Sequence, residues 1–183
     1  MKVIAIIPAR GGSKGIPRKN LINFKGKPLI QWSIEAASQS KYITDVIVSS
    51  DDDEILQYAS KTQNLIIIKR PKNLAQDNSR TEPVLSHALA SLKINNYDYL
   101  ILLQPTSPLR TSEDIDFAFE KLQNSEATSL ISVCELEHHP YKSFKVDEKG
   151  YLQGVINNNY PFYPRQELPK TYRANGAIYI IKV

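Results

Sequence analysis

The sequence is poor in cysteine and has no long apolar segment. Cys134 is the only thiol among 183 residues, so an intramolecular disulfide is impossible and zinc sites built from several cysteines are excluded. The apolar run Val3–Ile7 is far shorter than the roughly 20 residues of a membrane-spanning helix, and no signal-peptide cleavage region follows it. We therefore expect a soluble protein of the reducing cytoplasm, with no membrane partner.

Acidic residues are missing from the first 28 positions, which hold seven of the 23 Lys and Arg. The rest of the chain has 16 basic against 19 acidic residues, so the net charge of +4 comes from this segment. Such local charge favours one anionic ligand held at one place, whereas nucleic-acid binders spread cations over a face with stacking aromatics. We expect no nucleic-acid partner. Charge alone is equally compatible with an exposed cationic loop that binds nothing.

Strand-like and helix-like segments alternate along most of the chain. With 42% hydrophobic and 23% charged residues, one compact domain over residues 1–183 is the default. The apolar runs do not alternate with polar residues, which is typical of a sheet covered on both faces. We expect an α/β three-layer sandwich with a mostly parallel sheet. The expected strands are Val3–Ile7, Val46–Val48, Leu65–Ile68, Tyr99–Leu103, Ser129–Val133 and Ala177–Ile181. The expected helices are Pro28–Ser38, Asp52–Lys61, Glu82–Leu92 and Glu113–Leu122.

Helix start signals support these assignments. Pro28 suits a first helical position, and Ser50 with Asp53 and Thr111 with Asp114 have capping-box spacing.

The alternation stops near residue 137, and short, proline-interrupted pieces continue to about residue 172. This stretch is rich in Tyr and Phe, which is unusual for a disordered loop. We expect an arm inserted before the last strand that packs against a second subunit, with a mobile surface insertion as the alternative.

A glycine-rich, cationic loop follows the first strand, over Pro8–Asn20. Glycines let backbone N–H groups approach phosphate oxygens, and cations neutralise them. The spacing of Gly11, Gly12 and Gly15 matches neither the dinucleotide fingerprint nor the G-x-x-x-x-G-K-[ST] phosphate loop. Its position is more informative, because ligands of open α/β sheets lie at the carboxyl ends of the strands.

Two further polar loops follow strands that should end at the same edge. Gln104 to Arg110 follows the fourth strand, and Arg70 to Ser79 follows the third. Pro-Thr-Ser-Pro is also an ordinary stiff turn, and Ser79 has an alternative role as a helix cap. Three polar loops at one edge favour a nucleotide-type site.

The same residues carry a resemblance to a known family. In order along the chain they are Ile7–Gly15, Lys19-Asn20, Gly26–Leu29, Arg70-Pro71, Leu103–Arg110, Glu137–Pro140 and Arg173–Tyr179. Together they resemble the acylneuraminate cytidylyltransferases, or CMP-sialic acid synthetases, over essentially the whole chain. The resemblance implies a Rossmann-like nucleotidyltransferase fold with a protruding dimerisation arm, and hence a homodimer.

The resemblance implies transfer of CMP from CTP to the anomeric hydroxyl of a nine-carbon 2-keto sugar acid, with release of pyrophosphate. N-acetylneuraminic acid or a relative is the expected acceptor, because the relatives that activate the eight-carbon acid Kdo carry a different first loop. Legionaminic and pseudaminic acids remain alternatives, and pseudaminic-acid enzymes share much of this loop. A binding and dimerisation module that holds CTP without efficient catalysis is a further alternative.

Residue roles follow from the same resemblance. The implied catalytic residues are Arg10, Lys19 and Gln104. The implied nucleotide-binding residues are Ala9, Arg10, Gly11, Gly12, Lys19, Asn20, Arg70 and Ser79. The implied sugar-acid residues are Gln104, Thr106, Ser107, Lys142, Arg165, Asn175 and Tyr179. Lys142 and Arg165 would reach the site of the neighbouring subunit. Their alternatives are a solvated strand residue and an ion pair with Glu167.

The family also uses Mg²⁺, held by paired aspartates in a segment that lies beyond the position of Val183. We therefore expect Mg²⁺ as cofactor, with its ligands past the end of this sequence. Asp51–Asp53 are an alternative metal site, but three carboxylates at a helix start are also what the helix dipole favours. Cys134 is expected to be a small core residue, not a nucleophile.

Overall fold

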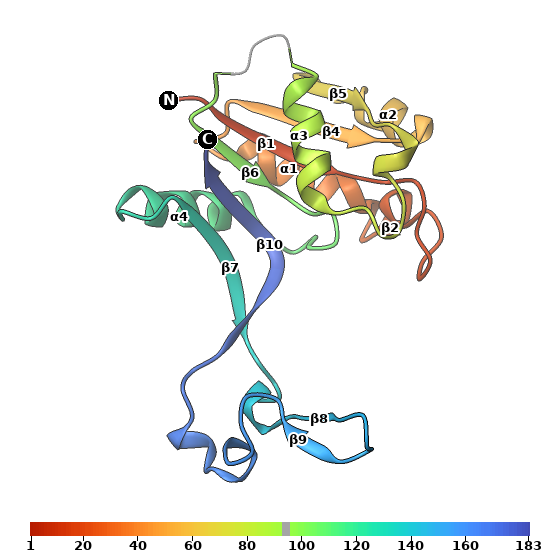
Figure 1. Ribbon diagram of the computed structural model, residues 1–183. Helices are drawn as coiled ribbons and strands as arrows, with labels where there is room; N and C mark the ends of the chain where they lie inside the picture. The colour runs from red at the N-terminus through yellow and green to blue at the C-terminus, as the bar shows by residue number, and fades with distance from the viewer. Residues whose placement is uncertain (93–95) are drawn as a thin grey trace. The chain divides into compact units, whose positions relative to one another are not determined.

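The computed structural model describes residues 1–92 and 96–183, and Figure 1 shows its ribbon. Two compact units form. The first joins Met1–Ser132 to Gly176–Val183, and the second is Val133–Asn175. The second unit encloses the stretch 137–172 that the sequence sets apart.

A six-stranded sheet forms the centre of the first unit, in the order β5-β4-β1-β6-β10-β7. β1 pairs in parallel with β4 and β6, and β4 pairs in parallel with β5. β10 runs antiparallel to β6, with Tyr179 opposite Leu102. The mostly parallel sheet is therefore confirmed. The strands are β1 (Val3–Pro8), β4 (Asp45–Ser50), β5 (Leu65–Lys69), β6 (Tyr99–Leu102), β7 (Ser129–Glu135) and β10 (Tyr172–Lys182).

Helices cover both faces of this sheet. They are α1 (Leu29–Gln39), α2 (Asp53–Ala59), α3 (Thr81–Ala90) and α4 (Ser112–Gln123). Val3, Ala5 and Ile7 of β1 share one buried cluster with α1, α2 and α4, while Ile4 and Ile6 share another with α3. Since adjacent strand residues point to opposite faces, α3 lies on the face opposite to the other three helices. Figure 1 shows α3 in front of the sheet and α1 behind it, which confirms the three layers.

Of the three helix starts predicted from the sequence, the structure confirms one and differs at the other two. Thr111 and Asp114 form the predicted capping box on α4. The predicted cap of α2 is wrong: Asp52, not Ser50, accepts from the N–H groups of Glu54 and Ile55. Pro28 is the N-cap of α1 and not its first residue. Both differences move the start of a helix by one or two positions.

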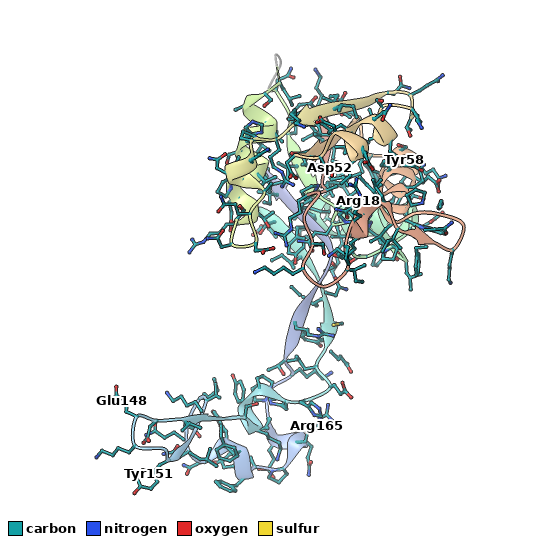
Figure 2. The ribbon with its side chains drawn as sticks, turned by 90° about the vertical axis from the view of Figure 1, so that its right-hand side faces the viewer. Arg18, Asp52, Tyr58, Glu148, Tyr151 and Arg165 are labelled. Atoms are coloured by element: carbon teal, nitrogen blue, oxygen red, sulfur yellow. The ribbon has the colours of Figure 1, made fainter. Side chains whose placement is uncertain are left out.

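The second unit is built from short pieces. β8 (Phe144–Val146) and β9 (Leu152–Gly154) form a small antiparallel hairpin. Three 3-10 turns surround it: η3 (Pro140–Lys142), η4 (Tyr160–Phe162) and η5 (Arg165–Glu167). Tyr160 packs against Tyr141 and Tyr163, with ring centroids 5.0 and 5.5 Å away. Figure 2 shows Glu148 and Tyr151 at the hairpin.

Two further predictions from the sequence, one for Cys134 and one for membrane-spanning helices, can be compared with the structure. Cys134 is only half-buried on β7, so the expected core position is not fully reached. Among residues 1–92 and 96–183, no helix combines the length and apolarity that crossing a bilayer requires.

Candidate nucleotide-binding site

The loop after β1 is fixed against the carboxyl end of β4. The N–H of Ala9 donates to the Ser49 carbonyl at 2.9 Å, and Ala9 itself is fully buried. The N–H of Gly11 donates to Oδ1 of Asp51 at 3.0 Å. A Cβ at Gly11 would lie 2.6 Å from a carboxylate oxygen of Asp52, so this close approach requires glycine.

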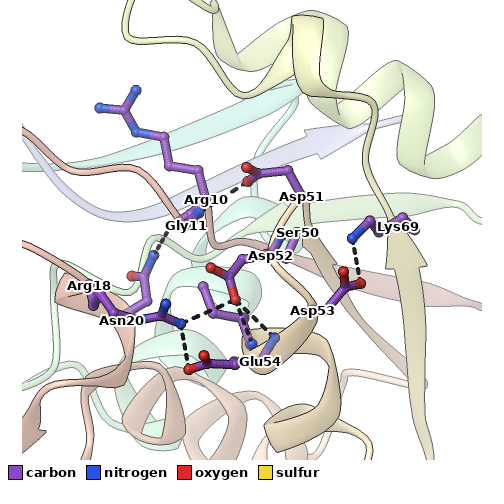
Figure 3. Close-up of polar contacts among 11 residues, drawn as sticks. Arg10, Gly11, Arg18, Asn20, Ser50, Asp51, Asp52, Asp53, Glu54 and Lys69 are labelled. Atoms are coloured by element: carbon purple, nitrogen blue, oxygen red, sulfur yellow. Dashed lines mark hydrogen bonds and ion pairs between the residues drawn. The ribbon is translucent and has the colours of Figure 1, made fainter.

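Asn20 ties the end of the same loop to its beginning. It is buried within the 3-10 turn η1 (Lys19–Leu21), and its Nδ2 donates to the Arg10 carbonyl at 2.8 Å. Nη2 of Arg18 pairs with Asp52 and, at 2.7 Å, with Glu54. Figure 3 shows this network, with the Arg10 guanidinium pointing away from the carboxylates of Asp51 and Glu54. The loop is therefore anchored on one side and presents Arg10 on the other.

A cleft of about 270 Å³ lies along the carboxyl ends of the strands in the first unit. Arg10 and Asn20 reach it from the loop after β1, Arg70 from the end of β5, and Gln104 from the end of β6. Such an edge is the usual ligand position of an open parallel sheet. Its lining is Pro8, Arg10, Gly12, Ser13, Lys19, Asn20, Arg70, Leu74, Gln76, Asp77, Ser79, Arg80, Thr81, Val84, Gln104, Pro105 and Thr106.

Arg70 is the most informative residue of this lining. It is 5% exposed, and neither Nε nor Nη2 has a hydrogen-bond partner among the described residues. Asp51 is the nearest carboxylate, at 3.7 Å from Nη2. Burial lowers the pKa of Arg70 and the neighbouring Arg10 adds to that shift, while Asp51 opposes it. A buried guanidinium with free N–H groups at the wall of a cleft fits an anionic ligand.

Two other cations of the site are already paired. Nη1 of Arg10 and Nζ of Lys14 each lie 2.9 Å from a carboxylate oxygen of Asp77. Lys14 and then Arg10 lower the pKa of Asp77 below its ordinary value of 3.8. Asp77 belongs to the loop between η2 (Lys72–Leu74) and α3, so this contact joins the loops after β1 and β5.

A second buried arginine organises the loop after β6. Arg110 donates to the carbonyls of Gln104 and Ala177, at 3.3 and 3.0 Å, and to Oγ of Ser33 at 2.7 Å. Burial lowers its pKa to about 10. Gly176 has a φ of +78°, and a Cβ there would lie 3.0 Å from Oε1 of Gln104. The backbone of Gln104 is thus held by Arg110, and the absence of a side chain at Gly176 leaves room for its amide.

Ser79 closes the loop before α3 instead of capping that helix. Its Oγ accepts from the N–H of Gln76 at 3.0 Å and donates to the Asn73 carbonyl at 3.2 Å. The N-cap of α3 is Arg80, which makes no side-chain capping bond. The capping alternative for Ser79 is therefore wrong, and the residue fixes the loop that carries Asp77.

The cleft brings together eight of the residues predicted for the nucleotide and sugar acid: Arg10, Gly12, Lys19, Asn20, Arg70, Ser79, Gln104 and Thr106. Ala9 and Gly11 do not line the cleft but anchor the loop to Ser49 and Asp51, and Tyr179 packs in the apolar cluster beneath α3. Ser107 lies close to Gly176, since its Oγ would be 3.9 Å from a Cβ built at that glycine. Sequence reasoning missed Gln76, Asp77, Arg80 and Thr81, although the polar run from Arg70 to Ser79 was a signal for the first two.

The remaining predicted residues belong to the second unit. Nζ of Lys142 donates to the Tyr163 carbonyl from the turn η3, so the strand alternative for Lys142 is wrong. Arg165 lines a separate hollow of about 150 Å³ with His139 and Tyr172, and its Nη2 lies 3.5 Å from the Leu136 carbonyl. No ion pair between Arg165 and Glu167 occurs in the described part of the chain. Asn175 is the last residue of this unit.

The carboxylates near the cleft do not fit a magnesium site. Asp51 accepts from Gly11, Asp52 caps α2, and Asp53 pairs with Lys69 on β5. Asp77 is held by two cations. In residues 1–92 and 96–183, no group of three or more His, Cys, Asp or Glu side chains is arranged to hold a metal.

The comparison with protein families assigns the chain. A family model described as "Cytidylyltransferase" matches residues 4–174. The chain belongs to the cytidylyltransferase family. It is accordingly a nucleotidyltransferase, and the cleft of this cytidylyltransferase is where a nucleotide-binding edge is expected.

Curated relatives agree with this family. A pseudaminic acid cytidylyltransferase of Campylobacter jejuni subsp. jejuni serotype O:2 is 38% identical over 181 residues, which cover 98% of this cytidylyltransferase and 78% of the relative. An N-acylneuraminate cytidylyltransferase of Streptococcus agalactiae serotype III is 35% identical over 182 residues, which cover 98% of this chain and 43% of the relative.

Solved structures share the fold. A CMP:2-keto-3-deoxy-manno-octonic acid synthetase complexed with CTP superposes with a TM-score of 0.70 at 22% identity, covering 100% of this chain and 74% of the other. A 4-diphosphocytidyl-2C-methyl-D-erythritol synthase from Anaerococcus prevotii superposes with a TM-score of 0.67 at 15% identity, covering 99% and 70%. At these identities the likeness concerns the fold alone.

Proposed function

We propose that this protein transfers CMP from CTP to the anomeric hydroxyl of a nine-carbon 2-keto sugar acid and releases pyrophosphate. The observation that carries the proposal is the buried Arg70, whose guanidinium is incompletely hydrogen-bonded in the described chain and which lines a cleft together with the further cations Arg10, Lys19 and Arg80. A polyphosphate supplies the acceptor oxygens that such a guanidinium lacks.

The chemistry asks the protein chiefly for positioning and charge neutralisation. The anomeric oxygen attacks the α-phosphorus in line, the bond to the oxygen that bridges to the β-phosphorus breaks, and the hydroxyl proton passes to water. Arg10 and Lys19 would stabilise the negative charge that develops on pyrophosphate as it leaves. Gln104, whose backbone carbonyl accepts a hydrogen bond from Arg110, would orient the nucleotide and the sugar acid through its side-chain amide.

Pseudaminic acid is the first candidate acceptor. The relative that is 38% identical carries that acid in its name, and the relative that is 35% identical carries N-acylneuraminate. N-acetylneuraminic acid and legionaminic acid are therefore included in the test. Lys142 and Arg165 stay predictions for contacts to the sugar-acid carboxylate, and a homodimer stays a prediction for the assembly.

The decisive experiment measures pyrophosphate release from CTP with each of the three acids, in the presence of Mg²⁺ as the family resemblance implies. We expect release with one acid above a control that lacks the acid. Arg10→Ala should weaken CTP binding, and Lys142→Ala should raise the KM for the sugar acid with little effect on that for CTP. Lys121→Ala, which removes an exposed cation of α4, should leave both unchanged and serves as the matched control.

Two results would contradict the proposal. Silence with all three acids, while CTP still raises the melting temperature, would leave a CTP-binding module without transferase activity. Affinity for DNA or RNA with a steep salt dependence, in place of CTP binding, would instead assign the basic loop to nucleic acid.

A further inference from the structure

We propose that Asp77 occupies the anion-binding position beside Arg10 and Lys14 in the free protein and is displaced by the β- and γ-phosphates, so that its carboxylate weakens the binding of CTP and pyrophosphate and leaves that of CMP unchanged. This inference rests on the proposed function of the cleft as the CTP site. It assigns a specificity-determining part to a carboxylate, a group that repels phosphate.

The contacts of Asp77 carry the inference. Its two carboxylate oxygens are used separately, Oδ1 on Arg10 and Oδ2 on Lys14, both at 2.9 Å. These are cations of the loop after β1, the loop that a triphosphate would meet. One carboxylate therefore bridges two positive groups in the way that a phosphate would.

The cations in and beside the cleft differ in their pairing. Arg10 and the adjacent Lys14 are paired with Asp77, whereas Nε and Nη2 of Arg70 have no hydrogen-bond partner within residues 1–92 and 96–183. A ligand with one phosphate can bind Arg70 without disturbing Asp77. A ligand that also needs Arg10 and Lys14 must compete with the carboxylate.

The position of Asp77 permits this exchange. Its side chain is 43% exposed, and that of Lys14 is 83% exposed, so neither partner is locked in the interior. The loop itself is fixed behind Asp77 by the bonds of Ser79 to Gln76 and Asn73. The carboxylate can therefore leave the cations by side-chain rotation, without unfolding of the loop. A pyrophosphate group carries more charge and more acceptor oxygens than one carboxylate, so it wins the competition.

The test compares the affinities of wild type and Asp77→Asn for three ligands by isothermal titration calorimetry. The amide keeps the size of the side chain but removes its charge. Because exposed ion pairs contribute modestly, we expect CTP and pyrophosphate to bind about 3-fold to 10-fold more tightly to the variant. CMP should bind both proteins equally. Asp53→Asn, which frees Lys69 by the same change of charge on α2, should leave all three affinities unchanged.

Each other outcome has a definite meaning. Weaker CTP binding by Asp77→Asn would show that the carboxylate assists the nucleotide, and equal binding would show that it does not compete; either overturns the inference. An equal gain for CMP would overturn the claim that Asp77 competes only with the β- and γ-phosphates. If wild type binds pyrophosphate but not CTP, and pyrophosphate binding still tightens in the variant, the proposed function fails while the displacement of Asp77 stands.

Discussion

At the scale of single residues, two buried arginines differ in their hydrogen-bond acceptors. We expect the poorly paired one to act in ligand binding and the other to stabilise the fold. Arg70 and Arg110 are 5% and 6% exposed, but Arg110 has three acceptors and Arg70 has only the distant Asp51. Nε of Arg110 also has no hydrogen-bond partner among the described residues, but its two other guanidinium nitrogens bind three acceptors. A buried charge with poor pairing disfavours the folded state, whereas one with several acceptors holds the structure around it.

Arg70→Met is predicted to weaken CTP binding by about 10-fold to 100-fold, because hydrogen bonds to a charged group contribute roughly 1.5–3 kcal/mol each. The melting temperature of the free variant should not fall, since the substitution removes a poorly paired buried charge. Calorimetry and thermal unfolding check the two expectations. Arg110→Met is the matched comparison: it removes the three hydrogen bonds to Gln104, Ala177 and Ser33 and should cost about 2–4 kcal/mol of stability. A fall in melting temperature for both variants would refute the expectation that only Arg110 stabilises the fold.

The pairing of Asp77 has a defined pH dependence. Lys14 and Arg10 lower the pKa of Asp77 from 3.8, so the carboxylate gains its stabilising contacts above that value and loses them only as pH falls through its lower folded pKa. The ratio of CTP affinities between Asp77→Asn and wild type should therefore be constant from about pH 6 to about pH 9. Binding measured at both ends of this range checks it. A ratio that approaches one near pH 6 would show that another group controls the contact.

At the scale of elements, the capping box of α4 is a local device with a measurable contribution. Oγ1 of Thr111 accepts from the N–H of Asp114, and the Asp114 carboxylate accepts from the N–H of Thr111. Thr111→Ala is predicted to lower the free energy of unfolding by about 1 kcal/mol, in a urea titration. Thr111→Ser keeps the hydroxyl and should lose much less. Equal losses for the two variants would mean that the methyl group, and not the cap, matters.

Elements with a strong local signal could be predicted from the sequence. The parallel strands are continuous apolar runs, and the structure moves their predicted ends by at most two residues, lengthening β1, β4 and β5 and shortening β6. The start of α2 could not be predicted correctly, because Ser50, Asp52 and Asp53 are all good capping residues. In the structure Asp52 is the N-cap of α2, and its carboxylate also forms an ion pair with Arg18. A sequence pattern cannot distinguish neighbouring residues of similar capping ability when their tertiary contacts decide which of them caps the helix.

The candidate site shows the same division. Residues in the glycine-rich loop and at strand ends could be predicted, since parallel topology brings strand ends to one edge. The pairing of Asp77 with Arg10 and Lys14 could not, because it joins loops more than sixty positions apart and depends on the path between η2 and α3. The hydrogen bonds that the Gln104 carbonyl accepts from Arg110 and Ser33 include one between segments 71 positions apart, so they likewise depend on the fold.

At the scale of the whole molecule, apolar exposure is uneven between the two units. More than half of the large apolar side chains that are exposed in the described residues belong to Val133–Asn175, the smaller unit. Among them are Phe162, 78% exposed, and Tyr151, 68% exposed. Exposed apolar surface of this kind is typical of an interaction surface. It agrees with the sequence-based proposal that this segment meets a second copy of the chain.

Light scattering coupled to size-exclusion chromatography tests that assembly. We expect wild type to have the mass of a dimer and Phe162→Ser to shift toward the monomer, because the substitution removes a large apolar side chain from the proposed interface. Phe117→Ser on α4, 69% exposed in the other unit, is the matched control and should stay dimeric. The family resemblance assigns Lys142 and Arg165 to the neighbouring subunit's sugar acid, so a monomeric Phe162→Ser should keep CTP binding and lose transfer to the acid. A monomeric wild type, or equal dissociation by both substitutions, would reject the second unit as the contact surface.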